Sequence, residues 1–333
     1  MRTDDFDYDF PPGLVAKTPA ERRDQARLLV VDRATDKLHD SRVCDLPEWL
    51  APGDLLVLND TKVLFGRLFG RRATGGRVEF LLLRREPGGA WQALVKAHRH
   101  LRPGEAVELD EGFSAELLER PEGGAIWRLE IKGPGDFDEA LGRLGRVPLP
   151  PYLKREDTPE DRVRYQTVYA QRTGSAAAPT AGLHFTPELL GKFDVAEVTL
   201  HVGYGTFKPI KTERVEDHRV EEEEFEVTEE AVRVIREREG RLVAVGTTAT
   251  RVLETLARSG GIRAASGRTD LFLYPGCEFH AVEALLTNFH LPKSSLFLLV
   301  CAFAGRERMM AAYRHAIENG YRFYSYGDAM LIL

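Results

Sequence analysis

Apolar and polar positions along the chain predict two kinds of structure that occupy different stretches. Before residue 65 and after residue 151, short strands alternate with amphipathic helices, which is the pattern of an α/β domain. Strands are predicted at 27–33, 37–42, 54–58, 195–202, 241–245, 271–274 and 321–326, and helices at 158–171, 228–239, 249–259, 281–287 and 306–319. The apolar stretch 295–303 fits either type and receives no assignment.

Between residues 65 and 151 the pattern changes to short apolar runs separated by turn residues. The runs lie at 78–83, 91–95, 106–109 and 126–131, with glycine- or proline-containing turns between them. Regular strand–turn spacing without long helices is typical of a small antiparallel barrel. We therefore expect an α/β main domain, formed by 1–64 and 152–333, that is interrupted by an inserted all-β barrel domain at 65–151.

Composition narrows the class of protein. The 333 residues are 43% hydrophobic and 29% charged, as in a globular chain with a sizeable core. The longest apolar run, 296–304, is much shorter than the ~20 residues that span a bilayer. The three cysteines are scattered and lack zinc-site spacing. These features predict a soluble, reduced, cytoplasmic protein without a metal site.

Charge is distributed unevenly although the net charge is only −6. The stretch 62–102 holds ten Lys or Arg against two acids, and the stretch 213–230 holds ten acids against two Arg. Such asymmetry can steer a polyanion to one face of a protein. The alternative is two solvated faces of opposite sign.

Three histidines, His184, His201 and His290, each lie beside Gly, Pro or Thr near a predicted element end. Loops in such places position catalytic and binding groups. Three histidines could also ligate zinc, as in a metal hydrolase, but no His-x-x-x-His or His-Glu-x-x-His spacing is present. Each histidine taken alone can equally be a hydrogen-bonded structural residue.

Several polar residues follow predicted strands, where α/β domains gather ligand-binding groups. They are Asp60, Thr61 and Lys62 after one strand, Gly246, Thr247 and Thr248 at a strand-to-helix junction, and Tyr326 and Asp328 near the chain end. Arg251 and Glu254, three residues apart, share one face of the helix that follows, which predicts an ordinary surface ion pair unless that face lines a cleft. The pair Gly203 and Gly205 invites a nucleotide-loop interpretation but lacks the third glycine.

Taken together, longer motifs resemble the S-adenosylmethionine:tRNA ribosyltransferase-isomerase family of queuosine biosynthesis. The resemblance runs nearly end to end, through 23–29, Pro-Gly-Asp-Leu-Leu-Val-Leu-Asn-Asp-Thr-Lys-Val at 52–63, Ala-Pro-Thr-Ala-Gly-Leu-His-Phe-Thr at 178–186, Thr-Leu-His-Val-Gly-Tyr-Gly-Thr-Phe at 199–207, Leu-Thr-Asn-Phe-His-Leu-Pro-Lys-Ser at 286–294, and 326–331. Motifs of this length and order are specific. They argue against a non-catalytic RNA-binding protein, which the basic stretch alone would permit.

The resemblance implies that S-adenosylmethionine serves as a ribosyl donor and co-substrate, with no tightly bound cofactor. The acceptor would be 7-aminomethyl-7-deazaguanine at the wobble position of tRNA, the product epoxyqueuosine-tRNA, and the leaving groups adenine and methionine. It also suggests a monomer without membrane contact.

Roles for individual residues follow from the resemblance. His201 or His290 would be the base, and Asp60 or Asp328 would hold the sulfonium or the ammonium of S-adenosylmethionine. Phe185, Phe207 and Phe289 would sandwich adenine, and Arg251 would bind a carboxylate or a phosphate. The further predicted substrate-binding residues are Thr61, Lys62, Gly182, His184, Thr186, Gly203, Gly205, Thr206, His218, Glu223, Gly246, Thr247, Thr248, Glu254, Asn288, Ser294 and Tyr326, and the predicted tRNA-binding residues are Arg71, Arg72, Arg84, Arg85, Lys96 and Arg99.

One segment departs from the family pattern. The family usually shows His-x-Met-His-x-Glu, and this chain has Val220 and Glu221 at the places of the methionine and the second histidine. An essential role for that histidine would impair this protein. We expect a binding or packing role for it instead, with His218 and Glu223 retained.

Overall fold

The larger part of the molecule is built on a nine-stranded sheet. The computed structural model describes residues 1–120, 124–207 and 209–333, with the backbone alone for 206 and 207. The strands follow the order β15-β13-β12-β3-β14-β16-β17-β1-β2. Their bounds are β1 Arg27–Asp32, β2 Lys37–Arg42, β3 Leu55–Asn59, β12 Asp194–Leu200, β13 Glu223–Val227, β14 Leu242–Val245, β15 Ala265–Thr269, β16 Ala284–Asn288 and β17 Ala329–Ile332.

Four neighbouring strands at the centre of this sheet, β12, β3, β14 and β16, run parallel. Every residue of β3 is buried, because helices cover both faces of the sheet. Leu55 and Val57 point to one core cluster and Leu56 and Leu58 to the other, as the two-residue period of a strand requires. The carboxyl ends of the parallel strands therefore open at the same edge.

Helices α5 (Glu229–Glu237), α6 (Gly246–Arg258), α7 (Ser295–Ala304) and α8 (Arg306–Glu318) contribute to the first core cluster. The opposite face carries α1 (Leu46–Trp49), α4 (Pro187–Leu190) and the short 3-10 helix η7 (Thr180–His184). The alternation of strands and helices predicted for the main part of the chain is confirmed.

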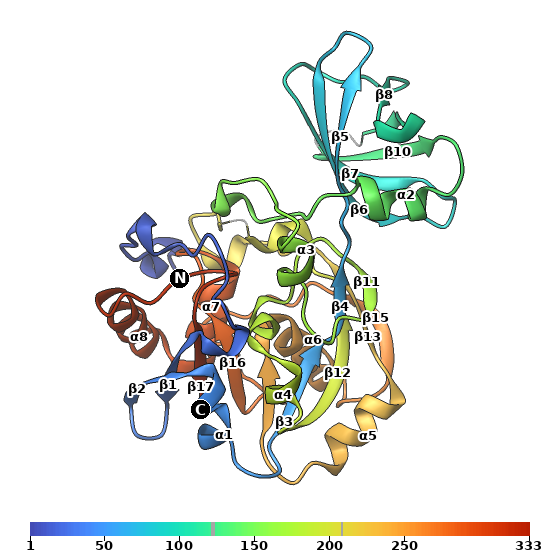
Figure 1. Ribbon diagram of the computed structural model, residues 1–333. Helices are drawn as coiled ribbons and strands as arrows, with labels where there is room; N and C mark the ends of the chain where they lie inside the picture. Colours follow the sequence, from blue (N-terminus) through green and yellow to red (C-terminus); the bar gives the residue numbers. More distant parts are fainter. Residues whose placement is uncertain (121–123, 208) are drawn as a thin grey trace.

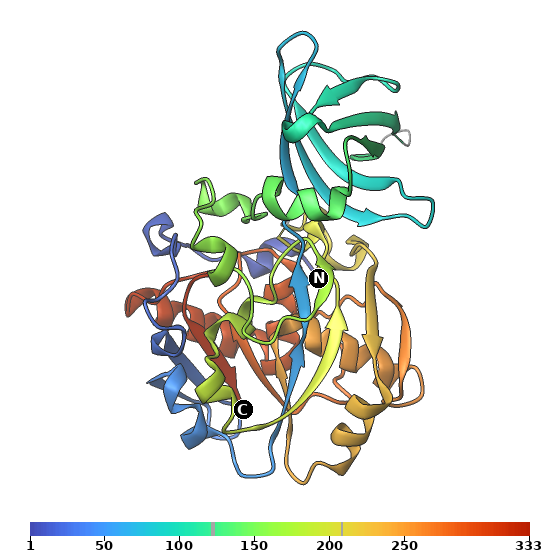
Figure 2. The same cartoon turned by 45° about the vertical axis from the view of Figure 1, so that its right-hand side comes forward.

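Six antiparallel strands form a separate closed sheet that lies beyond one end of the nine-stranded sheet (Figures 1 and 2). Their order is β10-β7-β6-β5-β8-β9, and a core cluster of its own fills the barrel. The bounds are β5 Arg67–Arg72, β6 Arg77–Arg85, β7 Trp91–Ala97, β8 Ala106–Glu108, β9 Ser114–Glu119 and β10 Ile126–Lys132, followed by α2, Phe137–Leu144. The boundaries of an inserted domain at 65 and 151 stay a prediction.

Two short strands join these parts of the molecule. β4 (Thr61–Val63) leads from β3 toward the barrel, and β11 (Arg172–Ser175) lies beside it and runs in the same direction. Polar contacts reinforce the junction, since the amide of Gln166 exchanges two hydrogen bonds of 3.0 Å with the backbone of Val63.

The predicted helix 158–171 is wrong for most of its length. Only α3, Asp161–Arg164, is helical. The Tyr165 side chain is fully buried and Gln166 is engaged with Val63, so tertiary contacts draw the chain out of the helix.

Three further predictions near the C-terminus are wrong. The predicted helix 281–287 overlaps β16, whose five residues are all buried between β14 and β17. Because such a run is apolar on both faces, its sequence shows neither the helical nor the strand period that would distinguish the two. The predicted strand 271–274 is not one, because the edge strand is the more polar β15. The predicted strand 321–326 is a turn, since Tyr324 has a φ of 72°, and β17 begins later.

Candidate functional site

Polar side chains lie at the carboxyl ends of the central parallel strands. Asn59, the last residue of β3, binds β12 and α6 together: its amide nitrogen donates to the Leu200 carbonyl and to Thr248 Oγ1, both at 3.0 Å. Its amide oxygen accepts from the Leu200 backbone N–H at 3.0 Å. Asn59 thereby fixes the point at which the chain leaves β12, and the next residue is His201.

The His201 ring is held from two sides. Its Nδ1 lies 2.8 Å from Thr61 Oγ1, and the Thr61 hydroxyl lies 3.5 Å from the Arg172 carbonyl oxygen, to which it donates. In the tautomer in which Nδ1 donates to this hydroxyl, Nε2 is unprotonated. On the other side the ring lies against Gly174, where an added Cβ would come within 2.7 Å of Cε1 and 2.8 Å of Nε2.

Titration of this region is shaped by burial and by neighbouring charges. Burial lowers the pKa of His201 below its usual value, while Glu224 and Asp60 oppose that shift. Asp60 accepts a hydrogen bond of 2.6 Å from Thr199 and lies 3.6 Å from Arg172. Burial raises the pKa of Asp60 in spite of these partners. His201 is therefore neutral near pH 7 and able to accept a proton.

A cavity of about 700 Å³ lies between the barrel and this edge of the sheet, and His201 lines it. Its charged lining combines arginines with carboxylates, and Trp91 adds an aromatic face. The volume falls within the range of small-molecule sites, roughly 300–1,000 Å³. The lining comprises Leu64, Leu83, Arg84, Arg85, Trp91, Gln92, Ile126, Asp138 and Leu141 from the barrel side, and Thr173, Gly174, Ala176, His201, Val202, Gly203, Tyr204, Glu221, Glu222, Glu223, Glu224 and Arg268 from the sheet side.

A smaller cavity of about 90 Å³ shares the wall formed by Gly203, Glu221 and Glu223. Glu223 is buried, accepts a hydrogen bond of 2.7 Å from the Gly203 backbone N–H and forms an ion pair with Arg251. An added Cβ at 205 would meet the Glu221 carboxylate at 2.8–3.0 Å, so that exposed side chain would have to move. The Gly203–Gly205 segment is thus a thin partition between two acid-lined cavities.

Comparison with known proteins places this architecture. Residues 3–332 match the family described as queuosine biosynthesis protein. S-adenosylmethionine:tRNA ribosyltransferase-isomerases from Trichlorobacter lovleyi and Thermotoga maritima are 47% and 49% identical, and each alignment covers 100% of both chains. A solved structure, the S-adenosylmethionine tRNA ribosyltransferase from Thermotoga maritima, is 40% identical with a TM-score of 0.55, over 99% of this chain and 100% of that one. This chain belongs to the queuosine biosynthesis protein family. The predicted family and the prediction that the chain is an enzyme are confirmed.

Within this member of the queuosine biosynthesis family, the predicted site residues divide among several places. Those at the two cavities are Arg84, Arg85, His201, Gly203, Gly205, His218, Glu223 and Arg251. Thr61 and Asp60 adjoin His201, as described above. The predictions for the side chains of Thr206 and Phe207 lie outside the described residues.

His184, Asn288 and His290 form a second cluster, which is buried. Burial lowers the pKa of both histidines to about 3. Asn288 Nδ2 lies 3.0 Å from His184 Nε2, and His290 Nε2 lies 3.1 Å from Thr287 Oγ1. His290 lines a cavity of only about 30 Å³, far smaller than the cavity of about 700 Å³ beside His201.

The predicted sandwich of adenine between Phe185 and Phe289 is wrong. Both rings are fully buried, and they belong to core clusters on opposite faces of the nine-stranded sheet. Phe289 packs edge-on against Tyr313 at 5.4 Å between ring centroids. Neither ring has a face free for a ligand, because each is enclosed by the core on its own side of the sheet.

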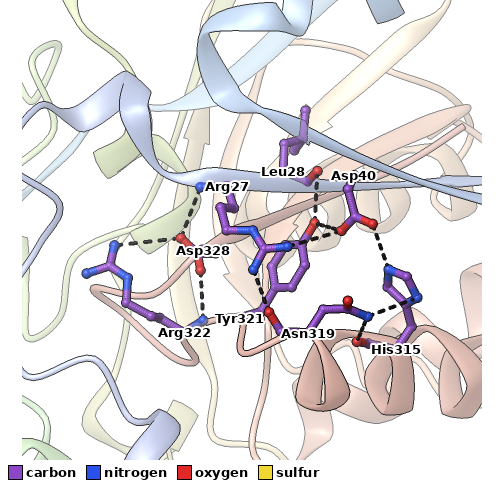
Figure 3. A network of polar contacts seen from close by, with 8 residues as sticks. All are labelled: Arg27, Leu28, Asp40, His315, Asn319, Tyr321, Arg322 and Asp328. Carbon is purple, nitrogen blue, oxygen red and sulfur yellow. Dashed lines mark hydrogen bonds and ion pairs between the residues drawn. The ribbon is translucent and has the colours of Figure 1, made fainter.

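The prediction that Asp328 holds a cationic ligand is also wrong. Its carboxylate accepts hydrogen bonds from the backbone N–H groups of Arg27 (3.0 Å) and Arg322 (2.7 Å), and the Arg322 guanidinium lies 3.6 Å away (Figure 3). Asp328 is 2% exposed. It fixes the chain end to β1 and has no part in the cavities.

Arg251 and Glu254 do not pair with each other as predicted. Arg251 also donates from Nε to the Leu271 carbonyl at 2.9 Å and from Nη2 to the Thr269 carbonyl at 3.2 Å, so its guanidinium is committed. Glu254 is fully buried and accepts from the backbone N–H groups of residues 280–282 at 2.8–3.0 Å. Glu254 supports a loop instead of binding substrate.

Other predicted binding residues have structural partners. Thr186 and Ser294 cap α4 and α7 by accepting from Leu189 and Phe297, each at 3.2 Å. Tyr326 donates a hydrogen bond to Asp161 at 2.7 Å, and a Cβ added at Gly182 would collide with the Tyr169 hydroxyl. Lys62 is exposed on β4. Gly246, Thr247 and Thr248 begin α6 and lie outside both cavities.

The predicted tRNA-binding arginines are not equivalent. Arg84 and Arg85 line the large cavity, where Arg84 pairs with Glu224 at 3.0 Å and Arg85 with Asp138 at 2.9 Å. Arg72 is engaged by Glu105 on the barrel, with 3.0 Å between Nη2 and Oε2. Arg71, Lys96 and Arg99 are exposed and form no ion pair with any described residue.

Several lining residues were not among the predicted site residues: Gly174, Glu221, Glu222, Glu224, Trp91 and Arg268. The acidic run 221–224 could have been chosen from its charge. Nothing in the sequence marks Gly174, because its role depends on contact with the His201 ring, which follows β12. In the described part of the chain no three His, Cys, Asp or Glu side chains gather as a metal site would need. No helix among the described residues has the length and apolar character to cross a membrane.

Proposed function

We propose that this protein transfers and isomerises the ribosyl moiety of S-adenosylmethionine onto 7-aminomethyl-7-deazaguanine at the wobble position of tRNA. The product is epoxyqueuosine-tRNA, and adenine and methionine leave. The observation that carries the proposal, beside family membership, is the large cavity. It joins a neutral histidine to carboxylates on the sheet side and to arginines and Trp91 on the barrel side.

The reaction needs a base, because the sulfonium makes the adjacent ribose carbon acidic and a proton must leave it. His201 fits this role better than His290. Its ring lines the large cavity, and the Thr61 hydroxyl holds the tautomer in which Nε2 accepts a proton. His290 is enclosed, with Thr287 at one ring nitrogen and the Tyr313 hydroxyl 3.4 Å from the other.

Carboxylates on the sheet side suit the cationic parts of the substrates. The sulfonium and the methionine ammonium of S-adenosylmethionine are both positive, and the acceptor amine must lose a proton before it attacks the sugar. Glu221 lines both cavities and occupies the place where the family usually has a second histidine. A carboxylate there retains a binding role for that position, so the departure from the family pattern does not by itself remove activity.

The barrel side suits RNA. A wobble base has to be unstacked to reach a buried site, and aromatic side chains or guanidinium planes commonly receive such bases. Trp91 and Arg85 lie together there, with the Arg85 guanidinium carbon 6.0 Å from the Trp91 ring centroid. Phosphate contacts outside the cavity would make tRNA affinity strongly dependent on salt.

The test mixes the purified protein with S-adenosylmethionine and tRNA that bears 7-aminomethyl-7-deazaguanine, and measures free adenine by chromatography. Adenine released only in the presence of that tRNA supports ribosyl transfer, whereas S-adenosylhomocysteine would indicate a methyltransferase. No turnover with intact tRNA binding would contradict the proposal.

The same assay separates the two histidines. We expect His201→Ala to abolish adenine release with tRNA binding retained. His290→Ala should lower stability and leave measurable turnover in the folded fraction. Full turnover by His201→Ala would refute its assignment as the base.

A further inference from the structure

The outer surface of the barrel carries a basic and aromatic stripe on β5. Arg67, Phe69 and Arg71 alternate with the buried Leu68 and Gly70, so the three side chains share the outward face. The neighbouring strand β6 adds Arg77 directly opposite Arg71 in the antiparallel register.

Like charges directly opposite on adjacent strands are destabilising unless something neutralises them. Arg71 and Arg77 are both exposed, and neither forms an ion pair with any described residue. Two other arginines on the same strand are satisfied: Arg67 pairs with Glu79 at 2.7 Å, and Arg72 with Glu105. On the other side of β5, Glu108 of β8 lies opposite Arg71 in the register, but no ion pair joins Arg71 or Arg77 to a carboxylate among the described residues.

Arg77 is also held in place. Its guanidinium carbon lies 4.2 Å from the centroid of the Phe69 ring, a cation–π contact that orients the group. Arg71, Arg77 and Arg146 border one hollow of about 410 Å³ in which Phe69 also takes part. Glu108 and Asp110 line it too, but three guanidinium groups outnumber two carboxylates. The sole ion pair of Arg146 with a described residue is a long one, 3.9 Å from Asp157.

We propose that Arg71, Arg77 and Arg146 bind a backbone phosphate of the substrate RNA, with Phe69 as the residue that positions Arg77. Guanidinium groups match the geometry of phosphate oxygens and remain charged at any physiological pH. This inference rests on the proposed function, which supplies the tRNA, and it adds a contact site outside the reaction cavity.

The position of the hollow favours RNA over a small free anion. Strand β6 runs from Arg77 at the hollow to Arg84 and Arg85 at the reaction cavity. At about 3.3 Å per residue the two ends lie roughly 26 Å apart. A stacked nucleic-acid strand that rises about 3.4 Å per nucleotide bridges that distance with about eight nucleotides. One anticodon arm can therefore occupy both places.

The experiment measures the affinity of the substrate tRNA for the full-length protein at several salt concentrations. The variants are Arg71→Gln, Arg77→Gln and Phe69→Leu. Lys132→Gln is the matched control, because Lys132 is an exposed cation on β10 of the same barrel, paired with Glu116 at 2.6 Å. We expect each arginine variant to bind about fivefold more weakly and to lower the slope of log affinity against log salt by about one. Phe69→Leu should weaken binding by a smaller factor, and Lys132→Gln should match the wild type.

Arginine variants that match Lys132→Gln in affinity and slope would overturn the phosphate site. Inorganic phosphate that competes with tRNA at millimolar concentration for the wild type, and equally for Arg77→Gln, would place the anion elsewhere and overturn it too. Adenine release by the wild type is measured in parallel. Its absence would refute the proposed function whatever the binding curves show, and its presence with unaltered binding of the variants would refute the phosphate site alone.

Discussion

Gly174→Ala is the perturbation that tests the position of His201 most directly. Residue 174 lies on β11 and has no positive φ, so alanine is compatible with the backbone. An added methyl group would, however, lie 2.7 Å from Cε1, 2.8 Å from Nε2 and 2.9 Å from Nδ1 of the His201 ring. Non-bonded carbon contacts are optimal at about 3.5–4.0 Å, so the ring has to move.

The size of the effect follows from that contact. To restore a separation of about 3.5 Å, the ring must shift by roughly 0.8 Å, away from Gly174 and out of line with Thr61 Oγ1. A misplacement of about 1 Å in a catalytic group costs about a hundredfold in rate. Stability should change in the other direction. Gly→Ala at a site whose backbone suits alanine stabilises a protein by about 0.4–1 kcal/mol, because it lowers the conformational entropy of the unfolded chain. We therefore expect turnover to fall about a hundredfold while the free energy of unfolding changes by less than about 1 kcal/mol.

The assay is adenine release with saturating S-adenosylmethionine and substrate tRNA, with urea unfolding as the stability measurement. Gly267→Ala is the matched control, since an added Cβ on that strand residue would meet Phe225 at 3.5 Å, an ordinary contact. A Gly174→Ala protein that turns over like Gly267→Ala would refute the argument that His201 must keep this ring position. A loss of turnover that accompanies unfolding would point to the fold instead.

Three further outcomes follow from the same site and its surroundings. Thr61→Val should reduce kcat by about ten- to a hundredfold, because it removes the hydroxyl that fixes the His201 tautomer. Thr61→Ser keeps a hydroxyl and should retain most of the wild-type kcat, so equal rates for the two variants would contradict this role. Wild-type kcat should fall only below pH ~6.5, since burial lowers the pKa of His201 and the base must be unprotonated; an acidic limb above pH 7 would speak against His201. His290 has a pKa of about 3 in the folded protein, so as pH falls from about 6.5 the unfolded chain takes up the proton and the folded protein loses stability. In urea unfolding, the free energy of unfolding of the wild type should exceed that of His290→Asn by an amount that shrinks by about 2 kcal/mol between pH 7.5 and pH 5. A difference that stays constant with pH would refute this linkage.

Strands and helices with one exposed face could be predicted from the sequence. The helix α5, with its Thr228 cap, lies where the pattern places it, because its buried residues Ala231, Val232 and Ile235 recur at the helical period. The hairpin β1–β2 was predicted from the turn between two runs of strand length, although the four central residues of β1 are all buried. β16 could not, since burial on both sides erases the period. The helix predicted at 158–171 failed for a different reason: the partners of Tyr165 and Gln166 come from distant parts of the chain.

For the site, the sequence identified the segments but not which side chains face the cavity. Motifs around His184, His201 and His290 look alike as sequence, and only the packing separates an enclosed histidine from one beside a large cavity. Phe185 and Phe289 show the same limit, because an aromatic residue in a motif can serve the core as well as a ligand. Gly174 was invisible, since its meaning lies in a contact with a residue 27 positions away.

At the large cavity, His201 is firmly held on the sheet side, whereas an ion pair between the two sides is exposed to solvent. His201 is held by Thr61, by Gly174 and by the Asn59 hydrogen bonds at the end of β12, so the sheet fixes the position of its ring. The barrel side is joined to the sheet side by the Arg84–Glu224 ion pair, whose side chains are 42% and 48% exposed. A pair this exposed contributes at most about 1 kcal/mol and weakens further with salt. A polyanion that competes for Arg84 therefore meets little resistance from this ion pair.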